Sequence, residues 1–263
     1  MKGLLFTILI FIGSLTSIQA QLPEDIFPLN RNYYSNGFYF TPSLNYNLSW
    51  DNTSESYSNQ DSVYSYQSSA EGDLGFGIEL GLFQSFERPI FFHYIEGGLA
   101  FRQYSGSANH AGQLFISDTL RNSYQSENTF THQHIIATFR AARADQLGKY
   151  TFLHSAIGVQ ANYLFSNQVK RETAYPYSFE EFPKDISAKA HLQFGLGIRL
   201  TELVLFVPSV EIPFLNLYLF DGLESRFPAF SNLHQPIIFN LKFMFLRKNL
   251  MNCNAPTYNG IPQ

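Results

Sequence analysis

The chain has 263 residues, a formal net charge of −4, an aromatic content of 17% and a single cysteine, Cys253. It carries no basic patch, which excludes a nucleic-acid partner, and one cysteine excludes an internal disulfide. Charged residues make up only 14% of the chain, and the length suits one domain of about 240 residues once a leader has been removed.

The N-terminus has the pattern of a secretory signal peptide. Lys2 precedes an apolar stretch over residues 3–13, and residues 14–20 end in Ala20. This predicts a signal peptide over residues 1–20 that is cleaved after Ala20. The apolar run is well short of the ~20 residues that a spanning helix needs, so a retained anchor is the weaker alternative. Residues 21–36 are predicted to form a periplasmic N-terminal segment.

Residues 38–50 alternate strictly between apolar and polar side chains. Phe38, Phe40, Leu44, Tyr46 and Leu48 fall on one face, and Tyr39, Thr41, Ser43, Asn45 and Asn47 fall on the other. A period of two over this length predicts a β-strand with one oily side and one polar side. Similar patterns recur along the chain and predict eight strands, over residues 38–50, 74–86, 91–104, 130–143, 150–165, 188–200, 204–219 and 237–246.

The connections between these strands alternate in length. Residues 51–72, 105–128, 166–187 and 220–236 are long and polar, whereas residues 87–89, 144–149 and 201–203 form tight turns. An even number of strands with this rhythm predicts an all-β, eight-stranded antiparallel transmembrane up-and-down β-barrel over residues 37–247. Both termini would then be periplasmic, the four long loops extracellular, and residues 248–263 a periplasmic C-terminal tail.

Aromatic residues gather at the predicted strand ends, where a membrane barrel carries its two girdles. One girdle is predicted from Phe38, Phe40, Phe86, Phe91, Phe92, Phe152, Phe206 and Phe245, and the other from Tyr46, Trp50, Tyr163, Phe165 and Phe220. The rival fold is a soluble lipocalin-like barrel, which would turn its apolar side chains inward. Charges and glycines on the opposite face of the strands argue against an apolar ligand pocket of this kind.

Those inward charges predict the contents of the lumen. An eight-stranded barrel is just wide enough for side chains to fill, and buried charges must pair, so a plugged lumen is expected. The predicted structural charge network consists of Glu79, Glu96, Arg102, Arg140, Lys189, Arg199, Glu211 and Lys242. Glu79 is expected opposite or diagonal to Glu96. Arg140 and Lys242 are their candidate partners, and Glu211 competes for Lys242.

The signal peptide, the eight alternating strands and the long-loop, short-turn rhythm together resemble the small outer-membrane barrels: the OmpA transmembrane domain, OmpX and the PorT-like barrels of bacteria with type IX secretion. The last strand, residues 237–246, looks like the β-signal that the barrel assembly machinery reads, although a tail follows it. The resemblance implies an outer-membrane location with lipid and assembly-machinery contacts. It supplies no catalytic residue.

An enzyme is the main functional alternative, because some eight-stranded barrels modify lipids with a His and a Ser. His154 and Ser155 are adjacent and must face opposite sides of a strand, so they cannot form a simple pair. His132 and His134 share a face, but two histidines are a weak metal site. The sequence thus predicts no catalytic residue, no metal site and no cofactor.

The expected role is a structural or interaction component of the outer membrane. A protein partner in a secretion or envelope complex remains open, as does a surface-loop adhesin or ligand-binding barrel. The second option draws on the tyrosines of the predicted outer loops, namely Tyr57, Tyr64, Tyr66, Tyr124, Tyr175 and Tyr177.

Overall fold

The computed structural model describes residues 26–27, 33–48, 52–59, 62–116, 119–171, 186–218 and 235–249. Several features predicted from the sequence lie outside these residues. They are the signal peptide, Trp50, Phe220, the loop residues Tyr175 and Tyr177, and Cys253 with the end of the C-terminal tail.

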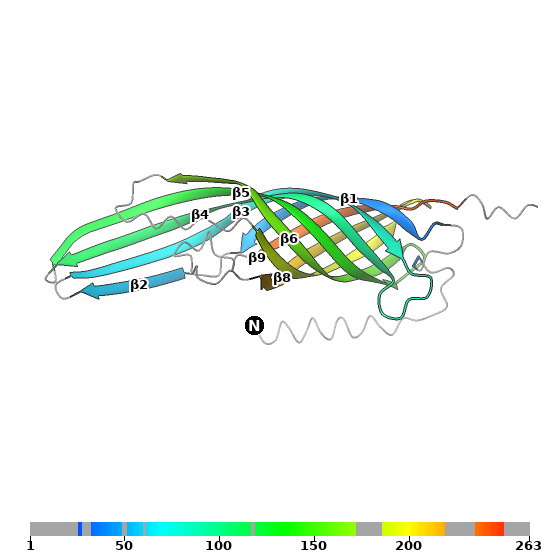
Figure 1. Cartoon of the computed structure of the whole chain (residues 1–263), viewed down its shortest axis with the longest axis horizontal. Helices are drawn as coiled ribbons and strands as arrows, with labels where there is room; N and C mark the ends of the chain where they lie inside the picture. Colours follow the sequence, from blue (N-terminus) through cyan, green and yellow to red (C-terminus); the bar gives the residue numbers. More distant parts are fainter. Residues whose placement is uncertain are drawn as a thin grey trace, which may run out of the picture.

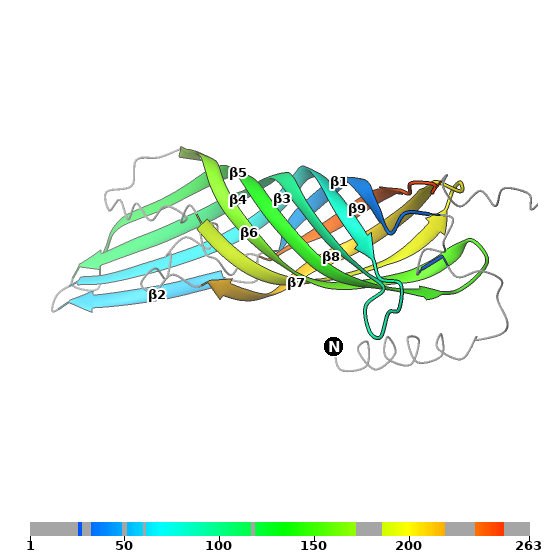
Figure 2. The same ribbon diagram turned by 45° about the vertical axis from the view of Figure 1, so that its right-hand side comes forward.

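The described residues form one antiparallel sheet that closes into a barrel (Figures 1 and 2). Its strands are β1 (Asn36–Leu48), β2 (Asn52–Asn59), β3 (Ser62–Ser85), β4 (Tyr94–Ile116), β5 (Thr119–Gln146), β6 (Thr151–Arg171), β7 (Ile186–Arg199), β8 (Val204–Tyr218) and β9 (Gln235–Phe245). The pairing order is β1-β9-β8-β7-β6-β5-β4-β3-β2, and β1 also pairs with β3. All of these strands except β2 therefore form a closed up-and-down ring of eight, which confirms the predicted fold class.

Short connections mark one end of the barrel, over residues 86–93, 147–150 and 200–203. We call this end the turn end. The sequence pattern predicted that residues 91–92 begin the next strand. They belong instead to the first of these connections, because β4 begins only at Tyr94. The residues just before β1 and just after β9 also meet here: the backbone of Tyr34 donates a hydrogen bond to the carbonyl of Arg247 (2.8 Å), and Tyr33 bridges to Lys248.

The opposite end, which we call the extension end, differs from the prediction. Residues 51–72 and 105–128 were expected to be long loops, but most of them continue the sheet. The strands β3, β4 and β5 run on past the barrel, and β2 pairs with residues 62–69 of β3. Figure 1 shows these four strands projecting beyond β6 to β9. The twelve residues at 62–73 correspond to about 40 Å of strand.

The reason that the sequence pattern missed this extension is its polarity. Exposed side chains in it include Ser65, Gln67, Gln113, Ser123 and Gln125, so no apolar alternation marks these strands. A register shift between Asp73 and Gly77 also changes which side chains of β3 share a face with β4. Backbone pairing across the four strands defines this part of the sheet.

Within the barrel, alternation separates two environments. On β1, Tyr39, Thr41 and Asn45 are buried, whereas Phe38 and Leu44 are about half exposed, at 49% and 58%. The same holds around the ring, where large apolar side chains face outward. On β3 they run from Leu74 to Leu82, about 26 Å of strand, which at a tilt of ~40° covers about 20 Å of depth.

The interior changes character along the barrel axis. A buried charged layer occupies its middle, and an apolar cluster fills the turn end, including Phe83, Tyr94, Phe152, Leu205 and Met244. Phe152 was predicted to belong to an outer aromatic girdle, but its side chain points inward and is fully buried. Phe38, Phe86, Phe91 and Tyr163 are exposed as a girdle requires. Among the described residues, no helix is long and apolar enough to cross a membrane.

Candidate functional site

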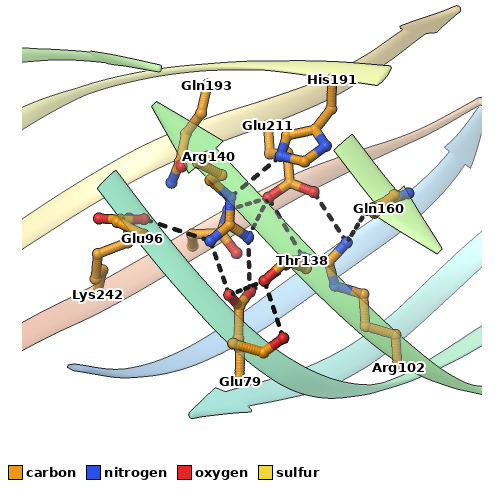
Figure 3. A network of polar contacts seen from close by, with 12 residues as sticks. Glu79, Glu96, Arg102, Thr138, Arg140, Gln160, His191, Gln193, Glu211 and Lys242 are labelled. Atoms are coloured by element: carbon orange, nitrogen blue, oxygen red, sulfur yellow. Dashed lines mark hydrogen bonds and ion pairs between the residues drawn. The ribbon is translucent and has the colours of Figure 1, made fainter. Parts of the chain in front are cut away.

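Six charged side chains meet in the middle of the lumen (Figure 3). They come from five strands: Glu79 on β3, Glu96 and Arg102 on β4, Arg140 on β5, Glu211 on β8 and Lys242 on β9. Each occupies an inward position of its strand's alternation, and each is at most 3% exposed. We call these six residues the lumen network.

Arg140 is the centre of the lumen network. Its Nη1 and Nη2 atoms each donate a hydrogen bond of 2.7 Å to one oxygen of Glu79. Nη1 also reaches Glu96 at 3.4 Å, and Nη2 reaches Glu211 at 3.3 Å. The remaining donor, Nε, contacts Nε2 of His191 at 3.1 Å. All three guanidinium nitrogens are therefore engaged, as a buried arginine requires.

The other two cations each bind a different carboxylate. Arg102 forms a two-point contact with Glu211, at 2.9 and 3.3 Å, and donates to Gln160 at 3.3 Å. Lys242 donates to both oxygens of Glu96, at 2.8 and 2.6 Å. Each carboxylate of the lumen network thus has a cation within direct hydrogen-bonding distance, which partly offsets the cost of removing both charges from water.

Neutral side chains donate further hydrogen bonds to the carboxylates. Glu79 accepts hydrogen bonds from the hydroxyls of Tyr39 (2.7 Å) and Thr138 (2.8 Å), and Glu211 accepts one from Asn240 (3.2 Å). Lys242 also lies 5.3 Å from the ring centre of Tyr39. The sequence analysis did not single out Tyr39, Thr138, Gln160, His191 or Asn240. Their inward alternation marks them as lumen residues, but their partners lie on strands distant in sequence.

The lumen network is electrically balanced. Its three carboxylates and three cations sum to zero. A close approach of the backbone makes room for it at Gly158, where an added Cβ would lie 2.7 Å from Cγ of Arg140 and 2.7 Å from Nε2 of His191. The barrel wall thus fits closely around the central arginine, whose charge is matched by the carboxylates of the lumen network.

Two of the eight predicted network residues are placed differently. Arg199 lies at the turn end, where it donates to the hydroxyl of Tyr33 (2.8 Å) and the carbonyl of Glu202 (3.4 Å), because its strand ends there. Lys189 faces inward on β7 at the level of Gln160 and Asn216, toward the extension end, and is partly exposed.

The predicted pairings within the network also need correction. Glu79 is not opposite or diagonal to Glu96: its register partner on β4 is Ala100, whereas Glu96 pairs with Phe83. The two carboxylates nevertheless share Arg140 as a cation. Glu211 does not compete for Lys242, because the two arginines bind Glu211 and Lys242 binds Glu96.

The His154–Ser155 pair and the His132–His134 pair were considered in the sequence analysis as candidates for catalysis or metal binding. His154 is fully buried and contacts the hydroxyl of Tyr94 at 2.8 Å, while Ser155 is on the opposite face of β6. His132 and His134 have ring centres 6.4 Å apart. Within the described part of the chain, no group of three or more potential metal ligands of the His, Cys, Asp and Glu types is present.

A closed antiparallel barrel with a charged, buried interior and an apolar exterior is a transmembrane β-barrel in architecture. No protein-family model matches the chain, and no curated protein matches it. Among solved structures, the chain is similar to the outer membrane protein OprG from Pseudomonas aeruginosa, with 10% identity and a TM-score of 0.32, over 82% of this chain and 97% of that one.

Proposed function

We propose that the protein is a non-enzymatic outer-membrane β-barrel with a side-chain-filled lumen, and that it acts as a structural or interaction component of the envelope. The single observation that carries this proposal is the balanced lumen network. Its three acid–base pairs join β5 to β3, β4 to β8 and β9 to β4, and every one of their charged groups is buried. A water-filled conduit would leave such groups solvated.

The outer-membrane location rests on the outward-facing side chains and on the sequence. Leu44, Leu74, Leu82 and Leu99 are between 58% and 68% exposed on the outside of the ring, where only lipid offers them an apolar environment. Together with the predicted signal peptide, this supports a barrel with both termini in the periplasm and the extension outside the cell. Membrane lipid and the barrel assembly machinery are its expected partners.

Conductance measurements test the filled lumen. The purified protein in planar bilayers should show little or no stable conductance, and the Arg140→Ala variant should show more, because it removes the central plug side chain. Large, long-lived channels in the unmodified protein would overturn the proposal. Heat-modifiable gel mobility of each preparation shows whether the barrel is folded.

The absence of enzyme activity is part of the proposal. His154 is held by Tyr94 inside the barrel, so it is not positioned to activate a nucleophile at the lipid surface. Incubation with radiolabelled lipid A and phospholipid should leave both unchanged. Release or transfer of an acyl chain, lost on His154→Ala substitution, would favour the lipid-modifying alternative instead.

A ligand-binding or adhesin role is the second candidate, and the sheet extension favours it. The register places Tyr57 opposite Tyr64, and Tyr66 and Tyr124 both opposite Gly112, so tyrosines from three strands are close in the sheet. Tyrosine, serine and asparagine are frequent contact residues in binding surfaces. Purification of the native membrane complex separates the candidates: a stoichiometric envelope protein favours a machine subunit, and an external ligand favours an adhesin.

A further inference from the structure

A short piece of chain outside all the strands fills the turn end of the barrel. Ile26 and Phe27 are each only 4% exposed and belong to the apolar cluster of the lumen. The ring of Phe27 stacks on Tyr94 with centroids 4.6 Å apart, and meets Phe152 edge-on at 5.9 Å. These two residues lie only six and seven positions beyond the predicted cleavage site at Ala20.

The walls that receive this segment belong entirely to the barrel. Phe83, Tyr94, Phe152, Leu205 and Met244 come from five different strands of the ring. Small inward side chains on β5 and β6 contribute to the same cluster, namely Ala142, Ala144 and Ala156. We call this set of wall residues the socket. The strands that carry the socket are paired with one another in the barrel, and its alanines leave room for an inserted ring.

Polar contacts hold the segment in place around the socket. The backbone N–H of Ile26 donates to Oε1 of Gln146 at 3.0 Å, at the end of β5. Further along the chain, Tyr33 accepts a hydrogen bond from Arg199 at 2.8 Å, and the guanidinium of Arg199 lies 5.7 Å from the Tyr33 ring centre. The contacts made by Ile26 and Phe27 are thus of the kind by which a short peptide docks: two apolar side chains in a cavity and one backbone hydrogen bond.

We propose that the socket is a binding site for a short apolar–aromatic peptide segment, and that Ile26 and Phe27 are its intramolecular occupant. The tether gives this occupant a high effective concentration, so the socket is filled in the isolated protein. A partner on the turn-end side that presents an Ile-Phe-like pair competes for the same site. Its binding replaces Ile26 and Phe27 in the socket.

A thiol-accessibility assay tests the proposal. Cys253 is the only cysteine, so a Cys253→Ser, Ala144→Cys protein carries one reporter thiol in the socket wall. Its reaction with a water-soluble maleimide should be slow. The added double substitution Ile26→Ser, Phe27→Ser should accelerate labelling at least tenfold by emptying the socket. Phe91→Ser, at a 70% exposed position of the same end, is the matched control and should leave the rate unchanged.

Addition of the segment in trans completes the test. A synthetic peptide of residues 21–32 should restore slow labelling to the double-substituted barrel in a saturable manner, and the same peptide with both serines should not. Heat-modifiable mobility must be the same for all variants, so that a loss of fold is not mistaken for an open socket. Equal labelling rates with and without Ile26 and Phe27 in folded protein, or equal protection by the two peptides, would overturn the proposal.

Discussion

Arg140 binds both oxygens of Glu79 through two parallel hydrogen bonds of 2.7 Å, and neither side chain is more than 3% exposed. This two-point contact crosses from β5 to β3 and skips the intervening β4. It fixes the orientation of the Arg140 guanidinium, which also contacts Glu96, Glu211 and His191. The lumen network therefore depends on one side chain more than on any of its other members.

Replacement of Arg140 by methionine should destabilise the barrel by about 3–5 kcal/mol, because the buried Glu79 loses both of its arginine hydrogen bonds and keeps only Arg102, at 3.6 Å, as a cation. Arg140→Lys should recover little of this, since an ammonium cannot make the paired contacts. Urea unfolding in lipid vesicles measures the loss. Arg143→Met is the control on the same strand: its ion pair with Asp145 is 45% and 41% exposed, and its loss should cost less than about 1 kcal/mol.

Lys242 and Glu96 should behave as a coupled pair. Lys242→Met removes the cation that contacts both oxygens of Glu96, and a second substitution, Glu96→Gln, should recover part of the lost stability because it removes the stranded charge. The sequence alone left Lys242 as a candidate partner of both Glu79 and Glu96. A double-mutant cycle compares the two choices: stronger coupling of Lys242 to Glu79 than to Glu96 would contradict the observed pairing.

The lipid-facing assignment predicts that arginine is costly at Phe194 or Ile78, which are 52% and 44% exposed on the outside of the ring. Either substitution should cost about 2–4 kcal/mol near mid-depth of a bilayer and reduce the yield of folded barrel. Ile90→Arg provides the control, since Ile90 is 95% exposed in a short connection of the turn end. Equal yields of Phe194→Arg and Ile90→Arg would mean that the outward face does not contact lipid.

Two glycines of the barrel wall, Gly158 on β6 and Gly97 on β4, differ in how closely other atoms approach them. Alanine at Gly158 should destabilise the barrel by about 1–3 kcal/mol, because its Cβ would crowd Arg140 and His191. Alanine at Gly97 should be tolerated, since the nearest atom to its Cβ is the carbonyl oxygen of Thr138 at 3.9 Å. The difference between their unfolding midpoints in urea is the measurement, and equal midpoints would argue against a tightly fitted arginine.

Sequence alternation identified the barrel because each membrane-spanning strand has one apolar face, and that pattern is local. The same reasoning placed Glu79, Arg140 and Lys242 inside. It could not pair them, since the partner of each depends on the stagger between strands: Lys242 meets Glu96, 146 positions away in sequence. The strands at the extension end were not predicted because they are polar on the face whose exposure the structure describes. The burial of Ile26 and Phe27 was not predicted either, because two apolar residues are too few to show a period.

The ion pair between Lys242 and Glu96 has a consequence for how the barrel is made. Lys242 lies on β9, the last strand in the described part of the chain, whereas Glu79, Glu96, Arg102 and Arg140 lie in the first half of the ring. Before β9 is in place, the earlier strands carry a carboxylate whose closest cation is missing, and the seam between β1 and β9 is open. Without β9, the cylinder is open between β1 and β8 and the lumen network has one more carboxylate than cations, so a chain truncated before β9 lacks both closure and neutrality.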